Sequence, residues 1–257
     1  MDLGIAGKTA VVCASTSGLG RATAEALAAE GARVVVCGRR ADVAAGIAAG
    51  LPRAVGVGAD LLAPEGPATL LAAARTAFGP VDILVLNGPG PRPARVTEIR
   101  AEELGTAVDS LVTVHHRLVT GVLGHMRAQR WGRVLAIGSS AVAAPIGDLA
   151  LSGIGRTALA AYLKMLASEV AEDGVTVNML LPGRIATDRV RALDATRASR
   201  SGRDVAEVRA ESVRRIPMNR YGEPAEFGAT AAFLCGGPAS YLTGSAVRCD
   251  GGLVPGM

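Results

Sequence analysis

The sequence of 257 residues is poor in aromatic side chains, in lysine and in long apolar runs. Aromatic residues make up 3% of it, and only two of its 27 basic residues are lysines. A nucleic-acid-binding protein is expected to cluster basic residues beside stacking aromatics, so nucleic acid is not predicted as a partner. No apolar run approaches the roughly 18 residues needed to cross a bilayer, and residues 1–5 lack the basic and apolar regions of a secretory signal. We therefore expect a cytoplasmic protein without a membrane partner.

Cysteine and histidine are too few and too scattered for a disulfide framework or a metal site. The four cysteines form no Cys-x-x-Cys pair, and the three histidines lack the spacing of metal ligands. We expect the cysteines to be small buried hydrophobic residues in a reducing compartment. No metal site is predicted.

Short apolar segments alternate with longer alanine-rich segments, and hydrophobic residues make up 49% of the chain. This share excludes a disordered chain. Continuous apolar strands between helices are typical of a parallel sheet that is covered on both faces. No linker interrupts the alternation, so we predict an α/β fold in one Rossmann-type domain over residues 1–257. Its doubly wound parallel sheet has about seven strands and helices on both faces. The strands are expected at 8–13, 33–37, 54–57, 81–86, 133–137, 175–180 and 245–248, and the helices at 21–30, 43–49, 65–78, 102–127, 154–171 and 224–234.

A glycine-containing turn joins the first predicted strand to the first predicted helix. Gly18 and Gly20 allow a backbone to approach a pyrophosphate, and the helix that follows offers unpaired N–H groups. A tight turn without a ligand would also use such glycines, but the first βα unit of a doubly wound sheet favours a dinucleotide. The predicted cofactor contacts in this turn are Ser15, Ser17, Gly18, Leu19 and Gly20.

The second predicted strand is followed by Arg39 and Arg40. A fold that prefers NAD usually has an acidic residue here to hold the ribose 2′-hydroxyl, whereas an arginine suits a 2′-phosphate. The sequence therefore predicts NADP in preference to NAD. Two solvated surface arginines remain the alternative interpretation.

Several motifs resemble those of the short-chain dehydrogenase/reductase family, and the resemblance covers nearly the whole chain. Residues 13–20 match the TGxxxGxG motif, with Cys13-Ala14 in place of Thr-Gly, and residues 86–89 match the NNAG motif. Residues 220–226 and 241–252 are similar to the family's C-terminal signature. The resemblance implies further cofactor contacts at Asp60, Leu61, Asn87, Gly88, Pro182, Gly183, Ile185 and Thr187.

The catalytic motif departs from the family pattern of Asn, Ser, Tyr and Lys. Ser139 fits the serine position, but thirteen residues later stands Ser152 in place of Tyr, and four further on stands Arg156 in place of Lys. Leu111 occupies the usual Asn position. Only the serine of the tetrad is kept.

These substitutions remove the usual proton donor. Tyr162 and Lys164 are two residues apart, so they point to different sides of a helix. A serine hydroxyl is too weak an acid to be tuned towards neutral pH, and an arginine does not release its proton. It can still stabilise an alkoxide or hold the nicotinamide ribose. We predict Ser139, Ser152 and Arg156 as the catalytic residues of an NADP-dependent oxidoreductase with an atypical active site, in which water or a substrate group supplies the proton.

Two other functions remain open, because a fold does not determine its chemistry. The first is a non-redox lyase or cyclase that uses the bound nucleotide as a structural element. The second is a nucleotide-binding protein without chemistry, in which Ser152 and Arg156 would be remnants of a former site.

The segment 184–215 carries nine arginines and five acidic residues. By resemblance it forms a lid over the substrate. Its charge would attract an acidic substrate or a carrier-bound acyl group. The alternative is a solvated helix with local ion pairs, such as Asp204 or Glu207 with Arg209 and Glu211 with Arg214 or Arg215.

Two further residues lie near the predicted catalytic positions. His115 follows Leu111 by one helical turn, and we favour a packing or interface role for it over a pocket role. Asp148 precedes Ser152 by one turn and would serve either as a substrate contact or as a loop cap. The resemblance also implies a small-molecule substrate and a homodimer or homotetramer built through the long helices.

Overall fold

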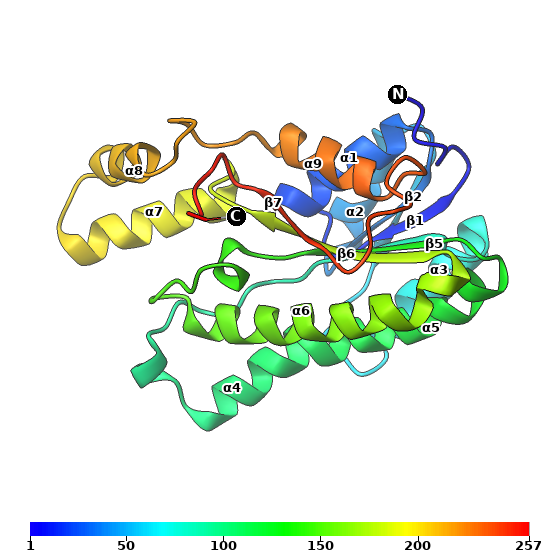
Figure 1. Ribbon diagram of the computed structural model, residues 1–257, viewed down its shortest axis with the longest axis horizontal. Coiled ribbons are helices and arrows are strands. Elements are labelled where there is room, and N and C mark those ends of the chain that lie inside the picture. The colour runs from blue at the N-terminus through cyan, green and yellow to red at the C-terminus, as the bar shows by residue number, and fades with distance from the viewer. Residues whose placement is uncertain (257) are drawn as a thin grey trace.

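A seven-stranded parallel sheet forms the centre of the computed structural model, which describes residues 1–256 (Figure 1). The strand order is β3-β2-β1-β4-β5-β6-β7, so the direction of winding reverses between β1 and β4. The predicted α/β fold and the predicted strands are confirmed, with boundaries shifted by a few residues. The strands are β1 (Thr9–Val12), β2 (Arg33–Gly38), β3 (Ala54–Gly58), β4 (Ile83–Leu86), β5 (Gly132–Ile137), β6 (Val175–Pro182) and β7 (Ala246–Cys249).

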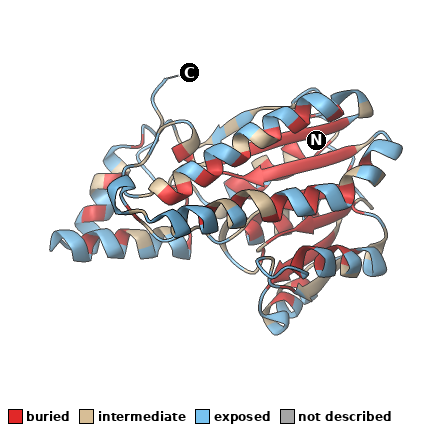
Figure 2. Cartoon of the chain, turned by 90° about the horizontal axis from the view of Figure 1, so that it is seen from below, coloured by how far each residue is buried: buried red, intermediate tan, exposed pale blue. Residues whose placement is uncertain are grey.

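Helices cover both faces of the sheet and give three layers (Figure 1). One layer contains α1 (Gly18–Ala29), α2 (Ala41–Ala49) and α9 (Pro224–Leu234). The other contains α3 (Gly66–Phe78), α4 (Ala101–Val108), α5 (Val114–Ala128) and α6 (Ala150–Val170). The five inner strands are buried, the edge strands β3 and β7 are partly exposed, and the helices expose their outer sides (Figure 2).

The core consists of two hydrophobic clusters, one on each face of the sheet. Neighbouring residues of a strand point to opposite faces, so Val11 joins the cluster beneath α3 and α5, and Val12 joins the cluster beneath α1 and α9. Both faces need apolar residues, which explains why the strands have continuous apolar sequences and no alternation. The cysteines follow the same logic: Cys13, Cys37 and Cys235 are buried, while Cys249 is partly buried.

The predicted helix over 102–127 is not α-helical throughout. The turn between α4 and α5 is a π-helix, η2 (Asp109–Thr113), and it contains Leu111. Leu111 is fully buried, and a Cβ atom at Gly155 of α6 would lie 2.7 Å from its Cδ1 atom. The wide turn, of a kind that often occurs at functional sites, therefore presents a packing side chain to α6, at the position where the resemblance leads us to expect an amide.

The arginine-rich segment forms two helices that project beyond the carboxyl ends of the strands, α7 (Asp188–Ser201) and α8 (Val205–Arg214) (Figure 1). Thr187 begins α7 as its N-cap, because its side chain accepts a hydrogen bond from the Val190 N–H at 3.4 Å. Short 3₁₀ turns lie at η1 (Val96–Glu98), η3 (Ser140–Val142) and η4 (Ala171–Asp173). Within residues 1–256, no helix is long and apolar enough to cross a membrane.

Candidate active site

A cavity of about 570 Å³ opens at the carboxyl ends of the strands, beside the point where the winding of the sheet reverses. Open α/β sheets bind their ligands at this place. The cavity brings together most of the predicted cofactor and catalytic residues. Those that border it are Ser17, Gly18, Leu19, Arg39, Asp60, Leu61, Asn87, Gly88, Ser139, Ser152, Arg156, Pro182, Gly183, Ile185 and Thr187.

The turn before α1 is shaped to receive a phosphate group. Ser17 is the N-cap of α1 but makes no side-chain cap bond, and no acidic residue lies in the first turn. The first N–H groups of the helix are therefore left for a ligand. A Cβ atom at Gly20 would lie 2.5 Å from the Ala14 carbonyl oxygen and 2.8 Å from Asn87 Nδ2, so only glycine fits. The residues present fit the pyrophosphate of a dinucleotide.

Three predicted cofactor contacts do not border the cavity. Ser15 is fully buried: its hydroxyl donates to the Val12 carbonyl at 2.6 Å and accepts from the Cys37 N–H at 2.9 Å. Its side chain therefore supports the turn from below. Gly20 lies behind the turn, and Arg40 is exposed at the start of α2.

The end of β2 supplies the groups that would distinguish NADP from NAD. Arg39 borders the cavity and has no ion pair with any residue of the described chain. Thr16, which the sequence reasoning missed, borders the same region and packs on Gly38, where a Cβ atom would lie 2.5 Å from Thr16 Cγ2. A guanidinium and a hydroxyl at one end of the cavity suit a 2′-phosphate.

Arg156 connects α6 to the end of β5 at the other end of the cavity. Its Nε donates to the Ser152 hydroxyl at 3.3 Å, and its Nη1 donates to the Ile137 carbonyl at 2.7 Å. Burial, and then the positive charge of Arg189, lower the pKa of Arg156 to about 10. The side chain therefore remains a cation at neutral pH. Ser139 lies nearby, and its hydroxyl accepts from the Ala141 N–H at 3.1 Å.

No tyrosine takes the place of the missing phenol. Tyr162 is on the outer part of α6, where its hydroxyl lies 3.1 Å from His116 Nδ1. The Tyr221 hydroxyl donates to Asp194 Oδ2 at 2.8 Å, and Tyr241 is fully exposed. None of the three borders the cavity.

His115 and Asp148 differ in whether they border the cavity. His115 is buried and does not border the cavity; its Nδ1 donates to the Leu111 carbonyl at 2.7 Å, and burial lowers its pKa. These contacts agree with the favoured packing role. Asp148 is exposed and borders the cavity, so a substrate contact stays open to it. Among residues 1–256 there is no group of three or more His, Cys, Asp or Glu residues that could hold a metal ion.

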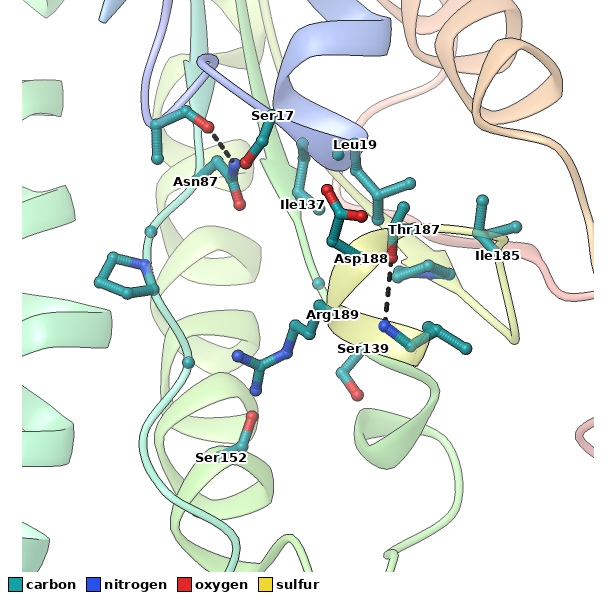
Figure 3. A pocket seen from close by; sticks show the side chains of 18 of the residues that line it. Ser17, Leu19, Asn87, Ile137, Ser139, Ser152, Ile185, Thr187, Asp188 and Arg189 are labelled. Atoms are coloured by element: carbon teal, nitrogen blue, oxygen red, sulfur yellow. Dashed lines mark hydrogen bonds between the residues drawn. The ribbon is translucent and has the colours of Figure 1, made fainter. Parts of the chain in front are cut away.

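The lid segment adds a cationic residue that sequence reasoning missed. Arg189 lies in the first turn of α7, and its guanidinium points across the cavity towards Ser152 (Figure 3). Leu193 and Arg197 border the cavity as well. Their spacing of four residues is that of one helix face, so a helix starting at the Thr187 cap could have revealed this face from the sequence.

Four of the other eight lid arginines pair with carboxylates. Arg184 contacts Asp194 at 2.8 Å, and Glu211 contacts Arg203 at 2.7 Å and Arg215 at 2.6 Å. The predicted pair of Glu211 with Arg215 is thus confirmed. The predicted pairing of Glu207 with Arg209 is wrong: Glu207 lies 3.6 Å from Arg203, and Arg209 lies over the Tyr221 ring at 5.1 Å.

Comparisons with known proteins show the family of the chain. Residues 13–254 match the family model described as enoyl-(acyl carrier protein) reductase. The chain is 35% identical to the short-chain reductase protein NovJ of Streptomyces niveus over 248 residues, which cover 95% of this chain and 92% of NovJ. The chain belongs to the short-chain dehydrogenase/reductase family. The resemblance predicted from the motifs is confirmed.

Other members of this family are similar in sequence and in structure. The 3-oxoacyl-[acyl-carrier-protein] reductase FabG of Escherichia coli K12 is 32% identical over 248 residues, which cover 96% of this chain and 97% of FabG. The L-sorbose reductase of Gluconobacter frateurii, whose structure is complexed with NADPH and L-sorbose, superposes with a TM-score of 0.94 at 31% identity and over 100% of both chains. The short-chain dehydrogenase/reductase described here thus has reductases as its relatives.

Proposed function

We propose that the chain is an NADP-dependent oxidoreductase that transfers hydride between its cofactor and a carbonyl or alcohol carbon at an atypical active site. The observation that carries this proposal is a single cavity with a phosphate-binding turn at one end and Ser139, Ser152 and Arg156 at the other. In this site Ser152 and Arg156 stand where the family has Tyr and Lys.

Arg39 and Thr16 support the choice of NADP. Thr16 follows β1, Arg39 follows β2, and both border the cavity. The structure of the related L-sorbose reductase is complexed with NADPH. When bound, the dinucleotide supplies or accepts the hydride. Leu19, Ile185 and Thr187 border the part of the cavity between the phosphate turn and Ser139, and they would hold the nicotinamide side (Figure 3).

The three predicted catalytic residues would stabilise the negative charge of an alkoxide and would not act as proton donors. The hydroxyls of Ser139 and Ser152 would hydrogen-bond a carbonyl oxygen, and the Arg156 cation would stabilise the alkoxide that forms from it. None of these groups is an acid tuned to neutral pH, so the proton comes from water or from the substrate. The loss of a placed general acid costs about 10²–10⁴-fold in rate, and we expect slow turnover of simple ketones.

The wider organisation follows from the same proposal. Residues 1–257 form one nucleotide-binding domain, and residues 184–215, with α7 along the cavity, act as its substrate lid. The substrate is a small molecule, acidic or carrier-bound, and FabG is a relative whose name includes an acyl carrier protein. Exposed apolar residues on α6, Ile154 and Met165, support a homodimer or homotetramer.

Cofactor binding and turnover test the proposal. NADPH and NADH are titrated by the fluorescence of the reduced nicotinamide, and we expect micromolar-scale binding of NADPH that is clearly tighter than that of NADH. A panel of ketones and alcohols is then followed at the absorbance band of the reduced nicotinamide. Equal or absent binding of the two cofactors contradicts the assignment of NADP, and product formation without any change of absorbance favours a non-redox lyase or cyclase.

A further inference from the structure

We infer that Arg156 and Arg189 together bind a carboxylate of the substrate, so that the substrate is a small oxo acid or hydroxy acid. The inference rests on the proposed function, because it places the carboxylate at the hydride-transfer end of the cavity. It names the substrate class that the proposed function leaves open, and it gives a role to Arg189.

Arg189 reaches into the cavity without any partner from its own chain. It has no hydrogen bond or ion pair with residues 1–256, whereas its neighbour Arg191 pairs with Asp188 and Arg184 pairs with Asp194. The guanidinium crosses to the β4 side of the cavity, where any side chain at Gly90 would collide with it. Figure 3 shows it directed towards the Ser152 hydroxyl.

Arg156 is a buried cation that also lacks a carboxylate partner. It is 8% exposed, and its hydrogen bonds go to the neutral oxygens of Ser152 and Ile137. A buried charge is costly unless an opposite charge accompanies it. Since Arg156 borders the cavity, a bound anion could supply that opposite charge.

Two arginines that face one cavity suit a planar anion. Each guanidinium has five N–H donors in a fixed fork, and Arg156 spends two of its groups on Ser152 and Ile137. The remaining donors of Arg156 and the whole fork of Arg189 are available. Carboxylates take such forks in a bidentate way, through charge-assisted hydrogen bonds that are about twice as strong as neutral ones. Arg156 and Arg189 would thereby share one carboxylate and offset their mutual repulsion.

The cofactor's own phosphates are a second source of negative charge. The phosphate turn, with Ser17 and Leu19, lies at one end of the view in Figure 3, and Ser152 lies at the other, with Arg189 between them. Arg156 is on the side of Ser152, to which it is hydrogen-bonded. This placement favours the substrate as the source of the anion, and the experiment below separates the two sources.

The experiment compares acids with their uncharged esters. The probes are 2-oxobutanoate and acetoacetate with their methyl esters, reduced with saturating NADPH, and the readout is the ratio of kcat/KM for acid over ester. The variants are Arg189→Met, Arg189→Lys and Arg156→Gln. Arg191→Met is the matched control, because Arg191 lies on the same helix, pairs with Asp188 and does not border the cavity. Calorimetry of 2-hydroxybutanoate binding to the NADPH-loaded chain gives a readout that needs no turnover.

We expect the native chain to prefer at least one acid over its ester by ~10–100-fold, the size of a charge-assisted contact. Arg189→Met removes this preference and the calorimetric signal, Arg189→Lys restores part of both, and Arg191→Met changes neither. The affinity for NADPH stays within about twofold in Arg189→Met. Thermal unfolding shows whether Arg156→Gln is folded when it loses the preference for the acid. If Arg156→Gln does not fold, the result for Arg189→Met alone tests the carboxylate site.

Other results would overturn the inference. Equal use of acids and esters by the native chain, together with no binding of 2-hydroxybutanoate, rules out a carboxylate site. An Arg189→Met variant with weakened NADPH binding and an unchanged acid preference assigns Arg189 to the cofactor. A chain that reduces ketones with NADPH but ignores the carboxylate refutes this inference and leaves the proposed function standing, whereas failure to bind NADPH refutes the proposed function itself.

Discussion

The Nε atom of Arg156 lies 3.3 Å from the hydroxyl of Ser152, one turn earlier on α6. By the motif spacing we predict that these two residues replace the Lys and Tyr of the family, and in the structure they interact with each other. The pair is therefore an alternative arrangement of the same helical face, in which a guanidinium that is a cation at neutral pH holds a hydroxyl that is a poor acid.

Restoring the phenol should restore acid catalysis. In the double variant Ser152→Tyr/Arg156→Lys, the site gains a phenolic hydroxyl as proton donor, and the lysine can lower the pKa of this hydroxyl. We expect the turnover of a simple ketone with NADPH to rise by about 10²-fold, measured as the loss of reduced-nicotinamide absorbance. Ser152→Phe/Arg156→Lys is the matched control, since it adds the ring without the hydroxyl. An equal gain in both variants would mean that the shape of the cavity, and not the missing acid, limits the rate.

Restoring the family's Asn at position 111 should damage the fold. Leu111 is fully buried in the π-helical turn and packs against Gly155. Leu111→Asn loses this packing and buries an amide without a designed partner, so we expect a loss of about 2–5 kcal/mol in the free energy of unfolding. Urea denaturation measures it, with Leu111→Met, which conserves volume, as the control. A stable Leu111→Asn variant would show that the turn can rearrange around an amide.

The choice between NADP and NAD should depend on Arg39 and not on Arg40. Arg39 borders the cavity, whereas Arg40, the N-cap of α2, does not. We expect Arg39→Ala to weaken NADPH binding by about 10–100-fold, the size of a charge-assisted contact, while the affinity for NADH changes little. Arg40→Ala provides a control with the same loss of charge on the surface. If both variants weaken NADPH equally, the general positive field of the region sets the preference.

The pH dependence of turnover should follow Arg156. Its pKa in the folded chain is about 10, below the ordinary value of 12.5, because burial and the charge of Arg189 disfavour the cation. The cation is present below pH 10, so its stabilisation of an alkoxide is retained there and is lost as the pH rises through 10. Burial raises the pKa of Cys37, which also borders the cavity, to about 11. We expect kcat/KM of the native chain for an uncharged ketone to be constant from pH 7 to 9 and to fall above pH 9. We expect kcat/KM of Arg156→Gln to be low at every pH and to show no such fall.

Ala14 should make the nucleotide turn less stable than the family's glycine would. Its φ angle is +45°, a conformation that costs a residue with a side chain about 1–3 kcal/mol. We expect Ala14→Gly to raise the free energy of unfolding by about 1 kcal/mol, after the entropy that glycine adds to the unfolded chain is taken into account. Thermal unfolding tests this, with Ala10→Gly in β1 as a control that should lower stability. A lower stability of Ala14→Gly would show that the methyl group packs favourably.

The sequence predicts the sheet well because its signal is local and repeated. Each strand is a short apolar run between helices, and Val11 and Val12 show why both faces must be apolar. The glycine turn is equally predictable, because Gly18 has a positive φ that favours glycine and Gly20 has no room for a Cβ atom. Family spacing also places Ser139, Ser152 and Arg156 in one cavity.

Contacts between distant segments are what the sequence does not reveal. Nothing next to Arg189 in the chain distinguishes it from the lid arginines that pair with carboxylates; only the start of α7 at Thr187 turns it towards the cavity. Ser15 is predicted as a cofactor contact because of its place among Ser17, Gly18 and Leu19, but it does not border the cavity as they do. Its hydroxyl is hydrogen-bonded to the Val12 carbonyl and to the Cys37 N–H, and Cys37 is 22 residues away in sequence.

The two hydrogen bonds of Ser15 have a consequence for coenzyme selection. They tie the exit of β1 to the exit of β2, and so they set the backbone separation between the glycine turn and the end of β2 before Arg39. In the proposed function this buried hydroxyl would act as a spacer between two points that contact the nucleotide. A change of coenzyme preference from NADP to NAD could therefore also be reached by a substitution at the buried Ser15, and not only at Arg39.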